Sequence, residues 1–168
     1  ASLALYALSY QVVRSLPIPA GPKDPTAEWR FDKPPIYGMG CDDGYFSARV
    51  KPCQFGSLQA EKTVLIIGDS IGAQWFSMLR LVFPEPRWQT IVVTKSACAM
   101  VDEDYFYKTI GKIYEVCSEW RADLLDRINK IDADIIVAGS AATYDFSDSQ
   151  WSEGSSRIFA RLSKSAEH

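Results

Sequence analysis

The sequence of 168 residues has a single histidine, His168, at its last position. Clusters of histidines that bind metals or relay protons are therefore absent from it. The sequence also has no large excess of either charge, since 18 Lys and Arg stand against 21 Asp and Glu, for a formal net charge of −3. Neither a Lys/Arg-rich run nor a stripe of stacking aromatic residues occurs. Nucleic acid is thus not an expected partner.

Motifs for metals and nucleotides are missing as well. The cysteines form no CxxC pair and no histidine lies among them, which argues against a zinc site. A Walker lysine pattern and a GxGxxG motif are also lacking, so a flavodoxin-like nucleotide or phosphate binder is the weakest hypothesis. We expect no metal and no organic cofactor.

Long apolar runs are lacking too. The apolar stretch 1–13 is too short to span a bilayer and is followed directly by Arg14. It has neither the basic start nor the small-residue cleavage site of a signal peptide. The tail of a preceding membrane segment and an amphipathic helix that packs on the domain both fit it.

The cysteines that are present are Cys41, Cys53, Cys98 and Cys117. Of the three possible connectivities, Cys41–Cys53 together with Cys98–Cys117 closes the shortest loops. Such disulfides persist in oxidising compartments, outside the cytoplasm. Four buried free thiols in a cytosolic protein are the alternative.

The length allows one hydrophobic core and is too short for two ordinary domains. Six prolines between positions 17 and 35 predict an extended connector, because proline cannot donate a helical hydrogen bond. We therefore divide the chain into 1–36, a helix remnant with a proline-rich connector, and 37–168, the main domain. The main domain opens with a glycine- and aromatic-rich lead-in, 37–57, that holds two of the cysteines.

Strand and helix patterns alternate through the main domain. Apolar, β-branched runs predict buried strands and helical spacing predicts helices, in the order strand 63–67, helix 70–83, strand 89–94, helix 117–131, strand 133–138 and helix 152–165. This order implies right-handed βαβ units and a parallel sheet covered on both faces. The first helix is predicted to bury an apolar face that comprises Ile71, Trp75, Met78, Leu79 and Val82.

The turn Gly68-Asp69-Ser70 lies where the first predicted strand passes into the first helix. Ligands of open α/β sheets bind at this carboxyl edge. Gly68 permits a tight turn, and Ser70 at a helix start has unpaired N–H groups beside it that can stabilise an oxyanion. The alternative is that Asp69 or Ser70 merely caps the helix.

Three segments follow one another in a familiar order: VLIIGDSIGAQW at 64–75, TKSACAM at 94–100 and IVAGSAATY at 136–144. With the preceding CQFG at 53–56, they resemble the SGNH domain that is fused to, or partnered with, membrane acyltransferase-3 proteins that O-acetylate bacterial surface polysaccharides. The resemblance runs from about position 37 to the end. It implies a flavodoxin-like α/β/α three-layer fold whose serine takes an acyl group, usually acetyl, and passes it to a sugar hydroxyl or to water.

The resemblance assigns roles to individual residues. Ser70 matches the catalytic nucleophile, in a turn formed with Gly68 and Asp69. The second segment, at Ser96 and Ala97, would supply a backbone N–H to the oxyanion hole beside the amide of Ser70, with Cys98 tethering that loop. No cofactor is implied, because the acyl donor is consumed as a substrate.

The sequence departs from the family pattern at three places. Ile71 follows the serine where many relatives have histidine, and the third segment lacks the asparagine that serves as an oxyanion donor. Ser140 is the substitute donor in that segment, or else only a small residue at a strand end. The family's DxxH motif is not matched either, because Ser165 stands three positions before His168.

A serine hydroxyl needs a base to become a good nucleophile. We therefore expect the domain to be incomplete at its C-terminus, with the catalytic Asp–His pair beyond the printed chain and this portion alone inactive. A carboxylate substitute is a weaker possibility, for which the candidates are Asp69, Asp102, Asp104 and Asp145.

The predicted function is serine-dependent O-acyl transfer or ester hydrolysis on a bacterial envelope glycan. Tyr144 and Phe146 follow a strand's carboxyl end and are candidates to line the glycan cleft. The protein is expected in the periplasm or outside the cytoplasm, tethered to the inner membrane through an acyltransferase-3 domain or partner. The alternative is a non-catalytic SGNH-like domain that binds a glycan or that partner.

Overall fold

The structure is a computed structural model that describes residues 33–42 and 44–164. The predicted N-terminal helix remnant and most of the connector, residues 1–32, lie outside the described residues, as does His168. The described residues belong to one compact unit, 33–168. Its first helix, α3 (Pro35–Gly38), begins inside the segment predicted to be connector.

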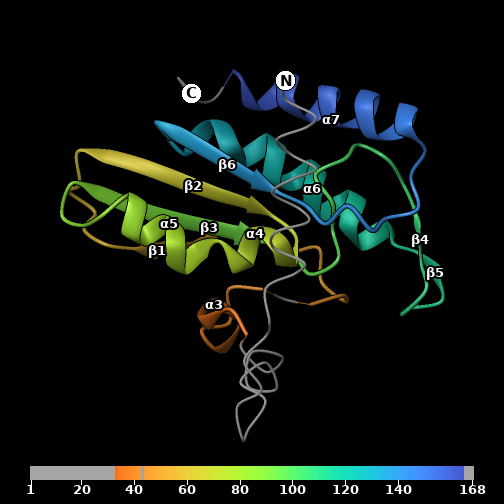
Figure 1. Cartoon of the computed structure of the whole chain (residues 1–168), viewed down its shortest axis with the longest axis horizontal. Helices are drawn as coiled ribbons and strands as arrows, with labels where there is room; N and C mark the ends of the chain where they lie inside the picture. Colours follow the sequence, from red (N-terminus) through yellow and green to blue (C-terminus); the bar gives the residue numbers. More distant parts are fainter. Residues whose placement is uncertain (1–32, 43, 165–168) are drawn as a thin grey trace, which may run out of the picture. The chain divides into compact units, whose positions relative to one another are not determined.

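A four-stranded sheet in the order β1-β3-β2-β6 forms the middle of this unit (Figure 1). The strands β2 (Lys62–Gly68), β3 (Trp88–Thr94) and β6 (Ile135–Gly139) are parallel, whereas β1 (Cys53–Phe55) pairs with β3 in the antiparallel sense. The apolar run of β2 is buried, as its sequence predicts, because both faces of the strand are covered. The short β1 was not predicted.

Helices lie on both faces of the sheet, so the unit has three layers. Alternate residues of β2 point to opposite faces: Leu65 and Ile67 pack with α6 (Glu115–Arg127) and α7 (Asp148–Leu162), and Ile66 packs with α4 (Ser70–Gln74) and α5 (Phe76–Val82). A 3-10 turn, Ile128–Lys130, extends α6. A small hairpin of β4 (Phe106–Tyr107) and β5 (Lys112–Ile113) precedes α6. The predicted α/β class with a mainly parallel sheet is confirmed.

The first predicted helix is in fact two short helices that are divided at Trp75, and Leu79 is the one residue of its predicted apolar face that is buried. Trp75 is 49% exposed, Met78 and Val82 are exposed too, and Ile71 is only partly buried. The face that packs on the sheet comprises Gly72, Ala73, Phe76 and Leu79.

Glycines explain the choice of this face. A Cβ atom at Gly72 would lie 2.8 Å from the Ile67 carbonyl oxygen, and one at Gly139 would lie 2.8 Å from the Gly72 Cα. The first turn of α4 therefore sits directly on the ends of β2 and β6. A large side chain at this contact would push the helix away.

Helix α7 begins four residues earlier than its apolar spacing predicts. Ser147 caps it, because the Ser147 hydroxyl accepts from the Gln150 N–H and the Gln150 side chain accepts from the Ser147 N–H. This reciprocal capping box satisfies N–H groups that the helix itself leaves unpaired.

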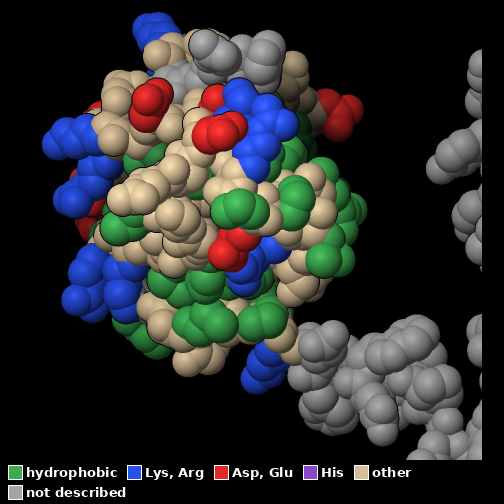
Figure 2. All heavy atoms as spheres, turned by 90° about the vertical axis from the view of Figure 1, so that its left-hand side faces the viewer, with side chains coloured by type: hydrophobic (Ala, Val, Ile, Leu, Met, Phe, Trp, Pro, Cys, Tyr) green, Lys and Arg blue, Asp and Glu red, His purple; other side chains and the backbone are tan. Residues whose placement is uncertain are grey.

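The opposite edge of the sheet, where the parallel strands begin, carries mixed charge. Figure 2 shows Lys and Arg side chains spread over this face with Asp and Glu side chains among them. One ion pair joins β2 to the residue before β6: the Asp134 carboxylate is 2.9 Å from Lys62 Nζ and accepts the Thr63 N–H at 2.7 Å. These hydrogen bonds hold the pKa of the Asp134 carboxyl below its usual value.

We predict that Gly72→Ala destabilises the fold by about 1–3 kcal/mol, because the added methyl group collides with the Ile67 carbonyl. Urea unfolding measures the effect. Gly38→Ala is the matched control, since nothing lies within 4 Å of a Cβ atom at Gly38. Equal stability of the two variants would contradict the close contact of α4 with the sheet.

We also predict that Asp134 contributes stability that depends on pH. Because its pKa is lowered in the fold, the contribution is present above the unfolded value of about 3.9 and is lost as the pH falls through the folded value. The difference in Tm between wild type and Asp134→Asn should therefore shrink from pH 6 to pH 3. An unchanged difference over this range would refute the assignment.

Candidate active site

The carboxyl ends of β2, β3 and β6 meet at one edge of the sheet, where Gly68 pairs with Thr94 on one side and Gly139 on the other. Three loops leave this edge. We call the turn 68–70 the first loop, residues 95–100 the second loop and residues 140–147 the third loop. Each loop lies within or overlaps one of the three sequence segments singled out above, at the edge where open α/β sheets bind ligands.

The Asp69 carboxylate joins the first loop to the third. It is fully buried; its Oδ1 accepts from the Ile71 N–H at 2.8 Å, and its Oδ2 accepts from the Ala141 N–H at 2.8 Å and the Tyr144 hydroxyl at 2.6 Å. Asp69 is thus the N-cap of α4, as one of the two hypotheses from the sequence held. Because Asp69 caps the helix, the Ser70 side chain is not needed as a cap and is available for another role.

The backbone of the first loop is held from both sides. The Asp69 N–H donates to the Gly139 carbonyl at 3.1 Å, and the Gly68 carbonyl accepts from the Lys95 N–H at 2.9 Å. Gly68 has a φ of 131°, and a Cβ atom there would lie 1.8 Å from the Gly139 oxygen. Only glycine fits this turn, for both reasons.

Ser70 is the first residue of α4 and is partly exposed. Neither its hydroxyl nor its backbone N–H makes a hydrogen bond with any residue that the structure describes. An uncommitted hydroxyl at a helix N-terminus is accessible to a substrate, and the N–H beside it is available to an oxyanion.

The second loop turns back on itself through a hydrogen bond from the Cys98 N–H to the Lys95 carbonyl, 3.1 Å long. Ala97 has a φ of 53°. Among the described residues, it is the one non-glycine residue with a positive φ. The Ala97 N–H has no hydrogen-bond partner among those residues. The Ser140 hydroxyl accepts from the Met100 N–H at 2.8 Å and so joins the third loop to the second.

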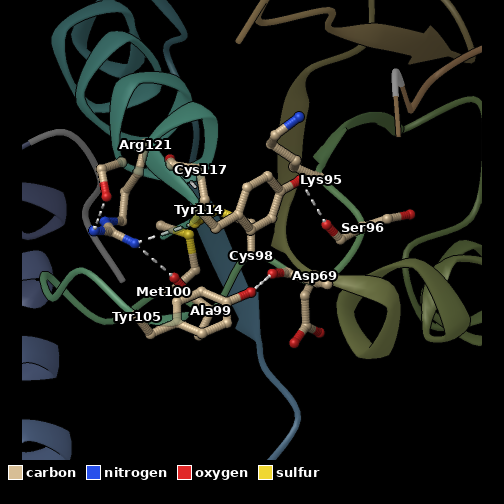
Figure 3. The surroundings of a disulfide bond; sticks show 12 residues. Asp69, Lys95, Ser96, Cys98, Ala99, Met100, Tyr105, Tyr114, Cys117 and Arg121 are labelled. Carbon is tan, nitrogen blue, oxygen red and sulfur yellow. Dashed lines mark hydrogen bonds between the residues drawn. A yellow bond between two sulfur atoms is a disulfide. The ribbon is translucent and has the colours of Figure 1, made fainter. Parts of the chain in front are cut away.

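Several groups anchor the second loop to its surroundings (Figure 3). A disulfide joins Cys98 to Cys117 in α6, and a second disulfide joins Cys41 to Cys53 in the lead-in. The Tyr105 hydroxyl donates to the Ala97 carbonyl, and the Tyr114 hydroxyl donates to the Ser96 carbonyl at 3.2 Å. The loop is therefore fixed by a covalent bond and two phenol groups.

The lead-in contacts the second loop through polar groups that sequence reasoning did not identify. Lys95, 1% exposed, donates through Nζ to the carbonyls of Gly44 at 2.7 Å and Ser47 at 2.6 Å. The Ser96 hydroxyl donates to Asp42 Oδ2 at 3.2 Å, and burial raises the pKa of the Asp42 carboxyl. These partners lie about 50 positions apart in the chain, so no local pattern signals them.

The predicted cleft residues Tyr144 and Phe146 belong to an aromatic cluster beside the first loop. Tyr144 packs edge-on against Tyr105 at 5.2 Å, and Phe146 packs against Trp151 at 5.5 Å. Burial and the bond to Asp69 raise the pKa of the Tyr144 hydroxyl, so it stays a neutral donor. Both side chains remain partly exposed, and their contact with a glycan stays a prediction.

No described carboxylate bonds to Ser70. The four candidates from the sequence are otherwise placed: Asp69 is a cap, Asp102 pairs with Arg157, Asp104 accepts from the Ser118 hydroxyl, and Asp145 is exposed. Within the described ranges, no group of three or more His, Cys, Asp or Glu residues could hold a metal ion.

A three-layer α/β unit with an uncommitted serine at the carboxyl edge of its sheet fits a hydrolase or acyltransferase-type domain. Comparison with family models agrees: residues 40–167 match the family described as SGNH domain (fused to AT3 domains). The chain belongs to this family. Comparisons with curated proteins and with solved structures find no match.

The family match and the disulfides indicate that the domain lies outside the cytoplasm. The family is fused to AT3 domains, and two disulfides are typical of a compartment outside the cytoplasm. Among the described residues, no helix has the length and apolar character to cross a bilayer.

We predict that Asp69→Asn lowers the free energy of unfolding by about 2–3 kcal/mol, because an amide nitrogen must then face a buried N–H donor. Tyr144→Phe, which removes only one of the three donors, should lose about 1–2 kcal/mol. Urea unfolding measures both. Exposed Asp145→Asn is the control, and if Asp69→Asn behaves like it, the carboxylate does not hold the loops together.

Proposed function

We propose that this domain catalyses serine-dependent O-acyl transfer, with acetyl as the acyl group, or the corresponding ester hydrolysis. The observation that carries the proposal is the state of Ser70: its hydroxyl is uncommitted, and its own N–H and that of Ala97 are unpaired among the described residues. A nucleophile and two donors for an oxyanion are what acyl transfer requires at one place. Membership of the SGNH family supports the assignment.

The mechanism has two displacement steps. Ser70 Oγ attacks the ester carbonyl carbon and loses its proton to a base. The base gives this proton to the leaving oxygen as the tetrahedral intermediate collapses, so that the first alcohol is expelled and acyl-Ser70 remains. A sugar hydroxyl or water then attacks the acyl carbon and releases Ser70. The N–H groups of Ser70 and Ala97 stabilise the oxyanion in both steps, with the Ser140 hydroxyl as a third candidate. Neither step needs a cofactor.

The base is the one part that the described residues do not supply. Ser70 has no histidine or carboxylate as a hydrogen-bond partner among them, and a serine hydroxyl at neutral pH needs one. The pH profile of turnover in the natural full-length protein would give the pKa of that base. A value near 6.5 would indicate histidine.

We propose a bacterial cell-envelope polysaccharide as the acceptor. Partly exposed aromatic rings at the third loop, Tyr144 and Phe146, offer faces on which a sugar can stack. We propose that an AT3 domain or partner in the inner membrane supplies the acyl group and that the reaction takes place in the periplasm. The family's fusion to AT3 domains and the two disulfides support this proposal.

A second candidate is a non-catalytic domain that binds the glycan or the AT3 partner. It is favoured by the third loop, where Ser140 stands in place of an asparagine donor. In this case Ser70 would contribute to binding without forming an acyl intermediate.

We predict that Ser70→Ala in the natural full-length protein abolishes acetate release from an aryl acetate, with a loss of at least about a thousandfold in kcat/KM. Ser77→Ala, at an exposed position of α5, is the matched control and should keep wild-type activity. Mass spectrometry should also find the acyl group on the peptide that contains Ser70. Activity that survives in Ser70→Ala would exclude Ser70 as the nucleophile, and a wild type without activity would favour the binding domain.

A further inference from the structure

We propose that Tyr114 and Tyr105 are positioning residues that turn the Ala97 N–H toward the Ser70 side of the second loop. The inference rests on the proposed acyl-transfer function, because it explains why the Ala97 N–H is available as an oxyanion donor. Neither tyrosine needs to contact substrate. Each acts through a carbonyl group of the second loop.

The geometry of the peptide bond between Ser96 and Ala97 determines where the Ala97 N–H points. In a trans peptide the C=O and the following N–H point in opposite directions. The Tyr114 hydroxyl holds the Ser96 carbonyl at 3.2 Å, so the Ala97 N–H of the same peptide is directed away from Tyr114. Figure 3 shows Tyr114, Tyr105 and Asp69, which precedes α4, around the second loop. We infer that this direction is toward Ser70, because the first loop adjoins the second loop through the hydrogen bond from the Lys95 N–H to the Gly68 carbonyl.

Ala97 is kept in an unfavourable backbone conformation by the groups around it. An alanine at a φ of 53° is strained and persists only where its surroundings determine it. Its carbonyl accepts from the Tyr105 hydroxyl, and the next residue is tied to α6 by the Cys98–Cys117 disulfide. The two phenols thus hold the consecutive carbonyls of Ser96 and Ala97 in a strained turn.

Tyr114 is itself firmly placed. It is 1% exposed, its ring stacks on Tyr107 at 5.5 Å, and the Lys95 ammonium lies over the ring at 5.7 Å. Burial raises the pKa of both the Tyr114 and the Tyr105 hydroxyls, so they are neutral donors at any physiological pH. A buried, immobile phenol is a suitable group to hold a carbonyl in one orientation.

Tyr114→Phe tests the proposal, because it keeps the ring and removes only the hydroxyl. In the natural full-length protein we expect kcat for aryl acetate hydrolysis to fall about tenfold to a hundredfold while KM changes less than about twofold, since an oxyanion donor acts in the transition state. Tyr105→Phe should act in the same direction and serves if Tyr114→Phe fails to fold. Tyr107→Phe is the matched control, because its hydroxyl does not bond to the second loop, and it should keep the wild-type kcat.

A second measurement does not depend on turnover. In a crystal structure of Tyr114→Phe, the peptide between Ser96 and Ala97 should be turned or adopt two orientations, whereas Tyr107→Phe should leave it unchanged. An active enzyme whose Tyr114→Phe variant keeps the wild-type kcat overturns the inference and leaves the proposed function standing. A wild type without turnover overturns the proposed function instead, and a peptide that keeps its orientation in Tyr114→Phe then overturns the inference as well.

Discussion

The buried Asp69 carboxylate is the interaction on which the rest of this edge depends. It accepts from the first turn of α4, from the backbone of the third loop and from the Tyr144 hydroxyl. Without it, three donors would lose the buried acceptor that they share. The same contacts leave the neighbouring Ser70 uncommitted, so a structural carboxylate and a reactive hydroxyl occupy consecutive positions with opposite tasks.

Close backbone contact makes that arrangement possible. Gly68, Gly72 and Gly139 meet where β2, α4 and β6 converge, and a methyl group at any of them would overlap its neighbours. The first and third loops are therefore held by the sheet itself. The second loop is held differently, by the Cys98–Cys117 disulfide and by phenol groups from the segment before α6. A loop with this many external anchors can keep a strained residue such as Ala97 in place.

Local patterns predicted a good part of this architecture. The apolar run of β2 and the turn that follows it are short-range signals, and they sufficed to place Ser70 at the carboxyl edge of a parallel sheet. The apolar periodicity of the first helix predicted the wrong buried face for most of its residues. Periodicity reflects only where apolar residues occur, and it does not show that Gly72 must contact the backbone of β2. Trp75 is consequently outside the core although it lies on the more apolar face of the predicted helix.

The sequence by itself determined the order of strands and helices, the family resemblance and the candidate nucleophile, because each of these is encoded within a few consecutive residues. Only the tertiary structure decided that Asp69 is a cap with partners in the third loop, that Lys95 holds the lead-in, and that Tyr114 holds the Ser96 carbonyl. The physical reason is distance along the chain. These partners are separated by 18 to 72 positions, and only the packing of the sheet and helices brings them together.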